Sequence, residues 1–497
     1  MTDSKRKKKR IRLGLTRLPY LLVTLVALYL WDQGTVAIGP LRFLCGITVL
    51  LALRHIFLVA RFPGFFTWFT APYIGLFLVY PIIAPMTGVD IPATDEVFLD
   101  YLFLAVSGLN LFILGYELTT SRRHSRRWND SYTTTSGRLA NTINILLALN
   151  LFAVVILIMN AGSFGAILSQ TRLDLKVNAG LLSMAGIYLL GLGALLYPLL
   201  AVQIRRRPSR GIFWIPIIVA LEVFLFLALR VRTFPVIHVV GLLVGWYLIC
   251  PRLTVLRSRR SPRLRSRLTT IQKFALVGVA CALVLGMFVH RTFRGQFQAA
   301  ESLGDVEINV ADSIRYAFEG GGELGYSKWV LQILEIVPSQ HEYLYGLSYY
   351  RLLFVPIPRS IWPEKPYNSQ RIVAQWLEED AVSVQTSPVG VIGDLYVNFG
   401  MWGILGMALF GMVFGRVDRS SSLTQALLLA VSFAMIFHLA RGGFTNPLIN
   451  LAVYFFAAHA TAKYLVGRAN VSPTINSQSN RSIDVAGTTP EVPHATS

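Results

Sequence analysis

Two cations lie on a proline-rich segment inside an apolar chain. The segment reads FVPIPRSIWPEKP, residues 354–366, and it carries Arg359 and Lys365. Its prolines remove backbone donors and clash with the preceding turn, so the segment cannot form an uninterrupted helix. Guanidinium groups bind phosphate with two parallel hydrogen bonds, and their charge does not titrate away. Such a stiff segment is suited to hold cations over a phosphate-bearing ligand.

A second segment, SPVGVIGDLYVNFGMWGILGMALFG at 387–411, places one carboxylate near the end of an apolar run. Asp394 is followed by Tyr396 and Asn398, and then by a glycine-rich face that predicts close helix packing. A carboxylate at the membrane interface can accept a proton from a sugar hydroxyl. It can equally pair with one of the arginines, and both interpretations remain open.

Further arginines lie near the ends of apolar runs, on the side where arginine is normally scarce. They either pair with neighbouring acids and lipid headgroups, or form a ring that binds a lipid-linked diphosphate. His438 shares a helical face with Arg441, and is a candidate ligand, proton carrier or hydrogen-bonded core residue. Glu222 lies in the middle of an apolar run, where a charge is costly. We expect it either to face a partner within the bundle or to be a protonated packing residue. The candidate binding residues are Arg172, Arg230, Arg232, Arg294, Arg351, Arg371, His438, Arg441, Tyr396 and Asn398.

Composition predicts that a polytopic membrane protein carries these residues. Of the 497 residues 54% are hydrophobic and 14% are charged, and the mean hydropathy of +0.54 is too apolar for a soluble domain. An apolar run of roughly 20 residues spans a bilayer core, so the pattern predicts an all-α protein with about twelve transmembrane helices. These lie near 17–34, 39–59, 65–85, 97–118, 139–159, 181–202, 211–229, 233–250, 271–290, 388–415, 423–440 and 445–466.

The net charge of +20 is distributed in a way that predicts topology rather than nucleic-acid binding. Basic clusters at 5–10, 122–127, 205–207 and 251–267 flank apolar runs, which places them and the N-terminus in the cytoplasm. Weak contact with anionic lipid accompanies such clusters. The three cysteines match no metal or disulfide spacing. The predicted units are a basic arm (1–16), nine helices (17–290), an outer loop (291–387), three helices (388–467) and a disordered cytoplasmic tail (468–497).

The outer loop 291–387 is net acidic and much longer than the other loops. Loops of this length usually carry function. Three stretches predict short helices within it: SIRYAFE, SKWVLQILEIV and SQRIVAQWLEED. The second has Trp329, Ile333 and Ile336 on one helical face, which predicts that the loop folds against the membrane and covers a cavity.

Two motifs in this region carry a family resemblance. Pro358, Arg359, Trp362, Pro363, Lys365 and Pro366 are followed by Gly393, Asp394, Tyr396, Asn398, Phe399 and Gly400. This pair of segments resembles the oligosaccharide repeat unit polymerases, the Wzy-like O-antigen polymerase family, in which Glu is usual where this chain has Asp394. LRVRTFPVI at 229–237 and the later ARGGF also fit. Elsewhere the chain agrees with the family in topology alone.

The resemblance implies a glycosyltransferase with a GT-C-like helical fold in the cytoplasmic membrane of a bacterium. Such enzymes move a growing glycan from undecaprenyl diphosphate onto the next lipid-linked repeat unit. Arg359 and Lys365 would stabilise the leaving diphosphate, and Asp394 would deprotonate the acceptor hydroxyl, without a cofactor or metal. Implied partners are the lipid-linked glycan, membrane lipid, a chain-length regulator and a flippase, with no nucleic acid.

Two other functions remain open. An O-antigen ligase uses the same scaffold and transfers a finished glycan to a different acceptor. A polysaccharide or lipid transporter commonly has twelve spans. Against transport stand the single large outer loop and the absence of visible repeat halves in the sequence.

Overall fold

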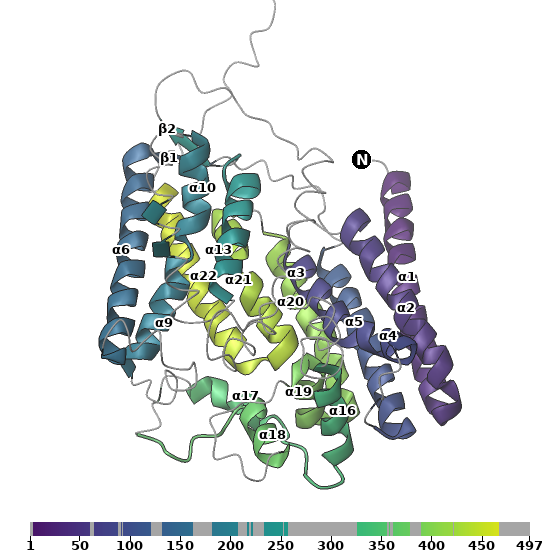
Figure 1. Ribbon diagram of the computed structural model, residues 1–497. Helices are drawn as coiled ribbons and strands as arrows, with labels where there is room; N and C mark the ends of the chain where they lie inside the picture. The colour runs from purple at the N-terminus through teal and green to yellow at the C-terminus, as the bar shows by residue number, and fades with distance from the viewer. Residues whose placement is uncertain are drawn as a thin grey trace, which may run out of the picture.

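Helices make up almost the whole described chain in the computed structural model (Figure 1). The structure describes residues 3–59, 64–87, 91, 93–120, 132–162, 181–206, 216–217, 220–221, 233–251, 253–256, 326–354, 357, 361–377, 389–420 and 422–466.

The first half of the chain contains helices that pack side by side, joined in places by single 3₁₀ or π turns. These elements are α1 (Asp3–Asp32), η1 (Gly34–Ala37), α2 (Ile38–Arg54), η2 (His55–Val59), α3 (Phe65–Tyr73), η3 (Ile74–Leu78), α4 (Val79–Thr87), α5 (Asp95–Thr120), β1 (Tyr132–Thr135), α6 (Ser136–Ala161), α9 (Leu181–Gly193), α10 (Leu196–Arg206), α13 (Thr233–Val244), η4 (Gly245–Ile249) and β2 (Leu253–Leu256).

The later part begins with short helices and ends with long ones. Its elements are α16 (Tyr326–Ile336), α17 (Leu347–Tyr350), η7 (Arg351–Phe354), α18 (Ser369–Leu377), α19 (Gly390–Phe399), η8 (Gly400–Leu405), α20 (Gly406–Asp418), α21 (Leu423–Gly442) and α22 (Thr445–Val466). The predicted helices SKWVLQILEIV and SQRIVAQWLEED are confirmed as α16 and α18. The third predicted helix, SIRYAFE, lies outside the described residues.

Seven helical stretches within the described residues are long and apolar enough to cross a membrane, which is the architecture of an all-α membrane protein. They are Gly34–Phe57, Phe65–Ala84, Asp95–Thr120, Ser136–Asn160, Tyr188–Arg205, Gly390–Asp418 and Leu423–Gly442. Each matches one predicted span. Five predicted spans remain. Helices α1 and α22 cover the predicted spans 17–34 and 445–466, and the shorter apolar stretch Ile237–Ile249 lies within 233–250. Almost all residues of the last two, 211–229 and 271–290, are outside the described residues.

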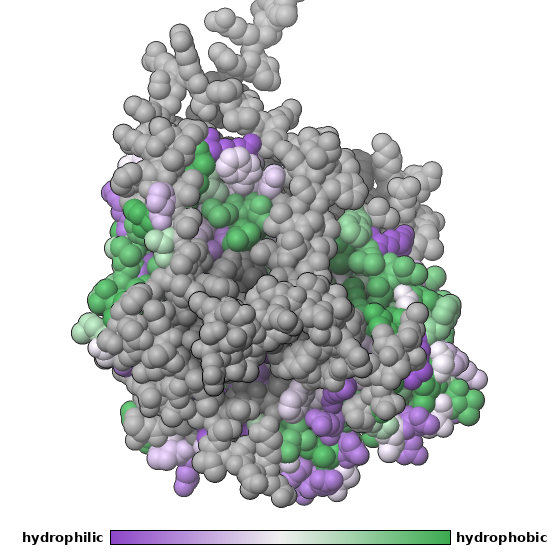
Figure 2. Space-filling model, in the orientation of Figure 1, coloured by the Kyte–Doolittle hydropathy of each residue, from purple (hydrophilic) through white to green (hydrophobic). Residues whose placement is uncertain are grey.

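The two ends of the bundle differ. Strands β1 and β2 pair in parallel, with Tyr132 opposite Leu253, and lie at one end, while α16, α17 and α18 lie at the other (Figure 1). The strand pairing joins the two loops that carry the basic clusters 122–127 and 251–267, as expected for loops on one side of a membrane. On the face shown in Figure 2, described apolar residues lie along both flanks and hydrophilic residues gather toward the ends.

The predicted span 388–415 matches the candidate span Gly390–Asp418, and the helix within it is interrupted. Helix α19 ends at Phe399, the 3₁₀ segment η8 follows, and α20 completes the span. Gly400 has φ 61° and ψ −153°, a combination essentially restricted to glycine, which breaks the helical path. A Cβ atom there would lie 3.1 Å from the Tyr343 ring, so the residues between α16 and α17 pack directly against the break.

Helix α20 packs closely on α5, and α16 is anchored beside them. Added Cβ atoms at Gly115 or Gly411 would collide with backbone of the facing helix, so these glycines allow the close approach that the sequence predicted. The π turn η3 leaves carbonyl groups without ordinary helical partners. The Ser327 hydroxyl donates to the Leu76 carbonyl oxygen at 2.8 Å, which fixes the start of α16 against this turn.

The predicted face of α16 packs against the core, and the buried side of the helix is wider than predicted. Val330, Ile333 and Leu334 are buried, whereas Trp329 and Ile336 are only partly buried. Ile333 of the predicted face is at the centre of the contact, because α16 packs against α5, η3 and α19 together.

Candidate functional site

Asp394 is the meeting point of four segments of the chain. The side chain is fully buried on α19. Its Oδ1 atom accepts a hydrogen bond from the Ser369 hydroxyl, at the start of α18. Its Oδ2 atom accepts from the Tyr349 hydroxyl of α17 at 3.1 Å, and from the Phe444 backbone N–H at 3.0 Å. Phe444 lies between α21 and α22. One carboxylate on α19 therefore joins α17 and α18 to the turn between α21 and α22.

Each segment that Asp394 binds also carries a predicted arginine. Arg351 follows Tyr349 by two residues, and Arg371 follows Ser369 by two. Arg441 precedes Phe444 by three residues, at the end of α21. A further contact links two of these segments, because the Gln370 side-chain amide donates to the Gly442 carbonyl oxygen. Three arginines that are far apart in sequence are therefore carried on backbone that meets at Asp394.

The guanidinium groups of two of these arginines lie over aromatic rings. The Cζ atom of Arg371 lies 4.1 Å from the centroid of the Tyr367 ring. The Cζ atom of Arg441 lies 4.6 Å from the centroid of the buried Tyr326 ring, at the start of α16. The negative face of an aromatic ring attracts a cation held over it, which restrains the position of each guanidinium group.

Lys365 is nearly fully buried instead of projecting from the proline-rich segment. Its Nζ atom donates to the Ile357 carbonyl oxygen at 3.0 Å, across the segment. This contact closes the segment on itself and adds to the rigidity that its prolines predict.

Tyr396 and Asn398 are buried on α19, where they hold the end of α16 and the start of α17. The Tyr396 hydroxyl donates to the Val337 carbonyl oxygen at 2.9 Å, just after α16. The Asn398 amide donates to the Asp394 carbonyl oxygen at 2.7 Å, and its Oδ1 atom accepts from the Ser348 hydroxyl at 2.9 Å. These contacts give both side chains a positioning role.

The remaining predicted residues are placed only in part. His438 is half-buried on α21, with its ring centroid 6.0 Å from that of Phe437. Five predicted cations and one acid lie outside the described residues, namely Arg172, Arg230, Arg232, Arg294, Arg359 and Glu222.

Tyr349 is the donor in its contact with Asp394. Burial, together with the neighbouring Asp394 carboxylate, raises the pKa of the Tyr349 hydroxyl well above its usual range. The hydroxyl therefore keeps its proton at any physiological pH. The same ring stacks on Phe399, with centroids 5.8 Å apart, so Tyr349 is fixed by packing as well as by hydrogen bonding.

Gly443 provides a direct test of the Asp394 contacts. Its φ of 86° and ψ of −172° belong to a region essentially restricted to glycine, and an added Cβ atom would lie 2.8 Å from Asp394 Cγ. We expect Gly443→Ala to cost about 1–3 kcal/mol from backbone strain alone. The contact with Asp394 adds to that cost and loosens the four segments.

Thermal unfolding in detergent measures this loss, with Gly162→Ala as the matched control. Gly162 has the same φ of 86°, but an added Cβ atom there meets nothing within 4 Å. Gly443→Ala should lower the melting temperature more than Gly162→Ala does. Equal losses would mean that the Asp394 contact contributes nothing.

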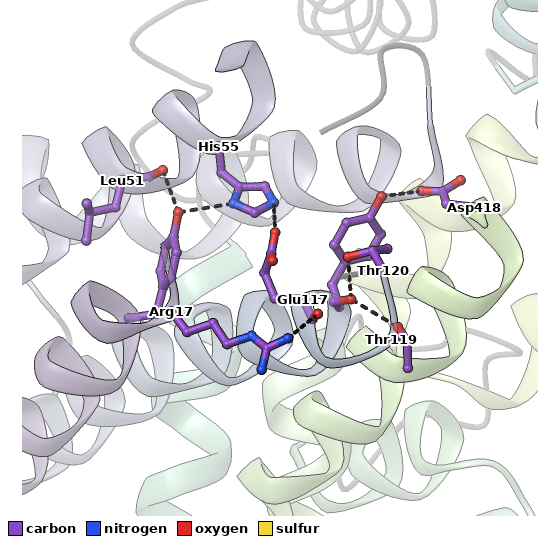
Figure 3. A network of polar contacts seen from close by, with 9 residues as sticks. Arg17, Leu51, His55, Glu117, Thr119, Thr120 and Asp418 are labelled. Carbon is purple, nitrogen blue, oxygen red and sulfur yellow. Dashed lines mark hydrogen bonds and ion pairs between the residues drawn. The ribbon is translucent and has the colours of Figure 1, made fainter. Parts of the chain in front are cut away.

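A second polar network lies between α1, α5 and the turn η2 that continues α2 (Figure 3). His55 Nε2 lies 3.2 Å from Glu117 Oε1, and both side chains are nearly fully buried. His55 Nδ1 lies 3.2 Å from the Tyr20 hydroxyl, and Arg17 donates to the Glu117 carbonyl oxygen at 2.9 Å. Buried ionisable groups in a membrane protein require partners, and here each helix supplies one.

Asp418 extends this network to α3 and α20. Its two carboxylate oxygens accept hydrogen bonds from the Phe65 and Phe66 backbone N–H groups, at 3.0 and 3.1 Å. Gly64 precedes the helix and has no side chain to cap it, so Asp418 supplies the acceptor from a distant part of the chain. Tyr116 of α5 donates to the same carboxylate at 3.2 Å.

Sequence reasoning missed several of these residues. Ser369 and Tyr349 have no motif of their own, and only the fold brings them to Asp394. A signal did exist for His55 and Glu117, because each is an ionisable residue at the end of a predicted span. Compared with protein-family models, with curated proteins and with solved structures, the chain matches none.

Proposed function

We propose that the protein polymerises lipid-linked oligosaccharide repeat units at the outer face of a bacterial cytoplasmic membrane. The growing glycan leaves undecaprenyl diphosphate and is joined to the next lipid-linked unit. The observation that carries this proposal is the convergence at Asp394 of three segments that each carry an arginine. Two of the three belong to the predicted outer loop 291–387, which contains the first of the two motifs resembling repeat unit polymerases. The scaffold would be GT-C-like, with the predicted twelve spans.

The reaction is a substitution at the anomeric carbon of the donor sugar. The acceptor hydroxyl oxygen forms the new glycosidic bond, the bond to the diphosphate oxygen breaks, and the hydroxyl proton passes to the departing diphosphate or to water. Negative charge develops on the departing diphosphate, and fixed cations aimed at it lower the barrier. Arg351, Arg371 and Arg441, with Arg359 of the proline-rich segment, are the groups that we assign to this charge.

Asp394 has a different role in this proposal. Its carboxylate is fully buried and accepts hydrogen bonds from Ser369, Tyr349 and Phe444. We assign it as a positioning residue that fixes the arginine-bearing segments. To act as the base for the acceptor hydroxyl, it would first have to exchange one of these partners for substrate.

Purified protein and synthetic lipid-linked repeat units in detergent test the function. The expected product is a ladder of lengths that differ by one repeat unit and remain attached to the lipid diphosphate. Transfer to a different acceptor without elongation would identify a ligase instead. The broken helix at Gly400 resembles the discontinuous helices of secondary transporters, which makes transport the second candidate. A ladder formed in detergent, without any sealed compartment, excludes transport as the main function.

Arg359→Lys should nearly abolish polymer formation, although the positive charge is retained. Lysine cannot present the planar pair of N–H donors that a diphosphate oxygen pair accepts. Loss of one preorganised donor of this kind typically lowers the rate by about 10²–10³-fold. The measurement is the initial rate of ladder formation by equal amounts of folded protein.

Arg419→Lys is the matched control for this substitution. Arg419 is exposed after α20, at the end opposite to Asp394, where its guanidinium group donates to the Thr119 carbonyl oxygen at 3.4 Å. Its replacement should leave the rate unchanged. Full activity of Arg359→Lys would remove Arg359 from the proposed diphosphate site.

A further inference from the structure

The short helix α17 and the turn η7 that follows it expose apolar side chains and bury a polar one, the reverse of what is expected for a segment in water. Leu347, Tyr350 and Leu353 are 46%, 50% and 73% exposed. They recur every third residue, a spacing that places side chains on one side of such a tight helical turn. Between them, the polar Ser348 is fully buried and donates to Asn398. The apolar side of this segment therefore faces outward.

This outward face continues onto a surface of η8 and α20 that lies within a candidate membrane span. Leu405 at the end of η8, and Leu409 and Val413 on α20, are exposed at four-residue spacing, as lipid-facing residues are. Trp402, which is 80% exposed, lies near the outer end of this row. Tryptophan is enriched at the membrane interface, so Trp402 marks the level at which the hydrocarbon region ends.

Direct contacts place α17 at the same level. The Tyr349 ring stacks on Phe399, which is itself partly exposed and lies three residues before Trp402. A Cβ atom added to Gly346, at the start of α17, would lie 3.4 Å from the Phe399 ring. Phe399 thus links α17 to the exposed apolar residues of η8 and α20.

We propose that α17 and η7 lie in the lipid bilayer interface, with Leu347, Tyr350 and Leu353 in contact with phospholipid acyl chains. The occupant is lipid, because the face continues the lipid-facing side of a membrane span. The segment is anchored on its inner side by the hydrogen bond from Tyr349 to Asp394. Lipid contact and the organisation of the candidate site therefore share one short segment. This inference stands independently of the chemistry proposed above.

Photocrosslinking in nanodiscs tests the proposal without altering the native cysteines. Benzoylphenylalanine replaces Leu353 in the full chain, which is reconstituted with phosphatidylethanolamine and phosphatidylglycerol and irradiated. Intact-mass analysis then measures the fraction of protein that gains the mass of one phospholipid. Leu409→benzoylphenylalanine is the lipid-facing reference, and Ser339→benzoylphenylalanine is the water-facing control at the same end of the bundle, where Ser339 is exposed.

The expected result is a phospholipid adduct at position 353 with a yield comparable to that at 409, and several-fold above that at 339. A yield at 353 as low as that at 339 would overturn the proposal, since the segment would then lie in water. A dominant crosslink to a second copy of the chain, or to another part of the same chain, would also overturn it. Each readout is independent of glycan synthesis, so a failure here would leave the proposed function untouched.

Discussion

Asp394→Asn is expected to lower polymer formation and thermal stability together. The carboxylate accepts three hydrogen bonds in a site with no solvent access. An amide has only one acceptor atom, and its NH₂ group must face at least one of these donors. Each buried donor left without a partner costs about 1–3 kcal/mol. The segments that carry Arg351, Arg371 and Arg441 would then shift, and a displacement of about 1 Å at a catalytic group can cost about 10²-fold in rate.

Two companion variants separate positioning from proton transfer. Tyr349→Phe removes one donor to Asp394 but keeps the ring that stacks on Phe399, so it should cause a partial loss of both rate and stability. Glu335→Gln, at an exposed position of α16 at the same end of the bundle, is the matched control for loss of a carboxylate and should change neither quantity.

The outcomes of these measurements are distinct. A rate loss of about 10²–10⁴-fold in Asp394→Asn at an unchanged melting temperature would instead identify Asp394 as the general base. Normal rate and normal stability would contradict both roles. Initial rates of ladder formation and melting temperatures in the same detergent are sufficient to decide.

Local patterns in the sequence predicted the elements of this site better than its contacts. Apolar periodicity correctly placed α16 and α18, since each helix buries one side against its neighbours. Asp394 could be singled out because a carboxylate inside an apolar run is costly and needs a reason. That the arginines form a ring around a diphosphate stays a prediction from their chemistry. The hydrogen bonds that bring the segments of Arg351, Arg371 and Arg441 to Asp394 depend on tertiary packing.

The break at Gly400 shows where such pattern reasoning fails. Gly400, Gly403, Gly406 and Gly411 were interpreted as one face that allows close packing between helices. Gly411 does pack against α5, but Gly400 adopts a backbone conformation that ends α19. The sequence cannot distinguish these two roles of glycine. Because glycine has no side chain, it permits both close helix packing and unusual backbone dihedral angles.

The paired residues His55 and Glu117 illustrate a related limit. Each was visible as an ionisable residue near the end of an apolar run, but α2 and α5 had to be placed side by side before either had a partner. The mid-span acid Glu222 was the stronger signal in the sequence. Hydropathy locates an ionisable residue whose burial costs free energy, and only the packing of the helices identifies the partner that offsets this cost.

Removing one member of the His55–Glu117 pair should destabilise the protein strongly. Glu117→Leu leaves the buried His55 ring without its carboxylate, and His55→Leu leaves the buried carboxylate without its imidazole. Breaking a buried pair in this way typically costs about 3–5 kcal/mol. The hydrogen bond from Arg17 goes to the Glu117 backbone and is retained in both variants. Melting temperatures in one detergent at one pH measure each loss.

The double variant His55→Leu/Glu117→Leu decides whether the pair itself is responsible. Replacing both members of a buried pair with apolar side chains is often neutral, since no ionisable group is then left unpaired. Tyr20 still reaches the Leu51 carbonyl oxygen, at 3.2 Å. The double variant should therefore lose much less stability than the sum of the single variants. Strictly additive losses would mean that the two side chains act separately. The rate of polymer formation per folded molecule should not change, because this network lies at the end of α5 far from Asp394.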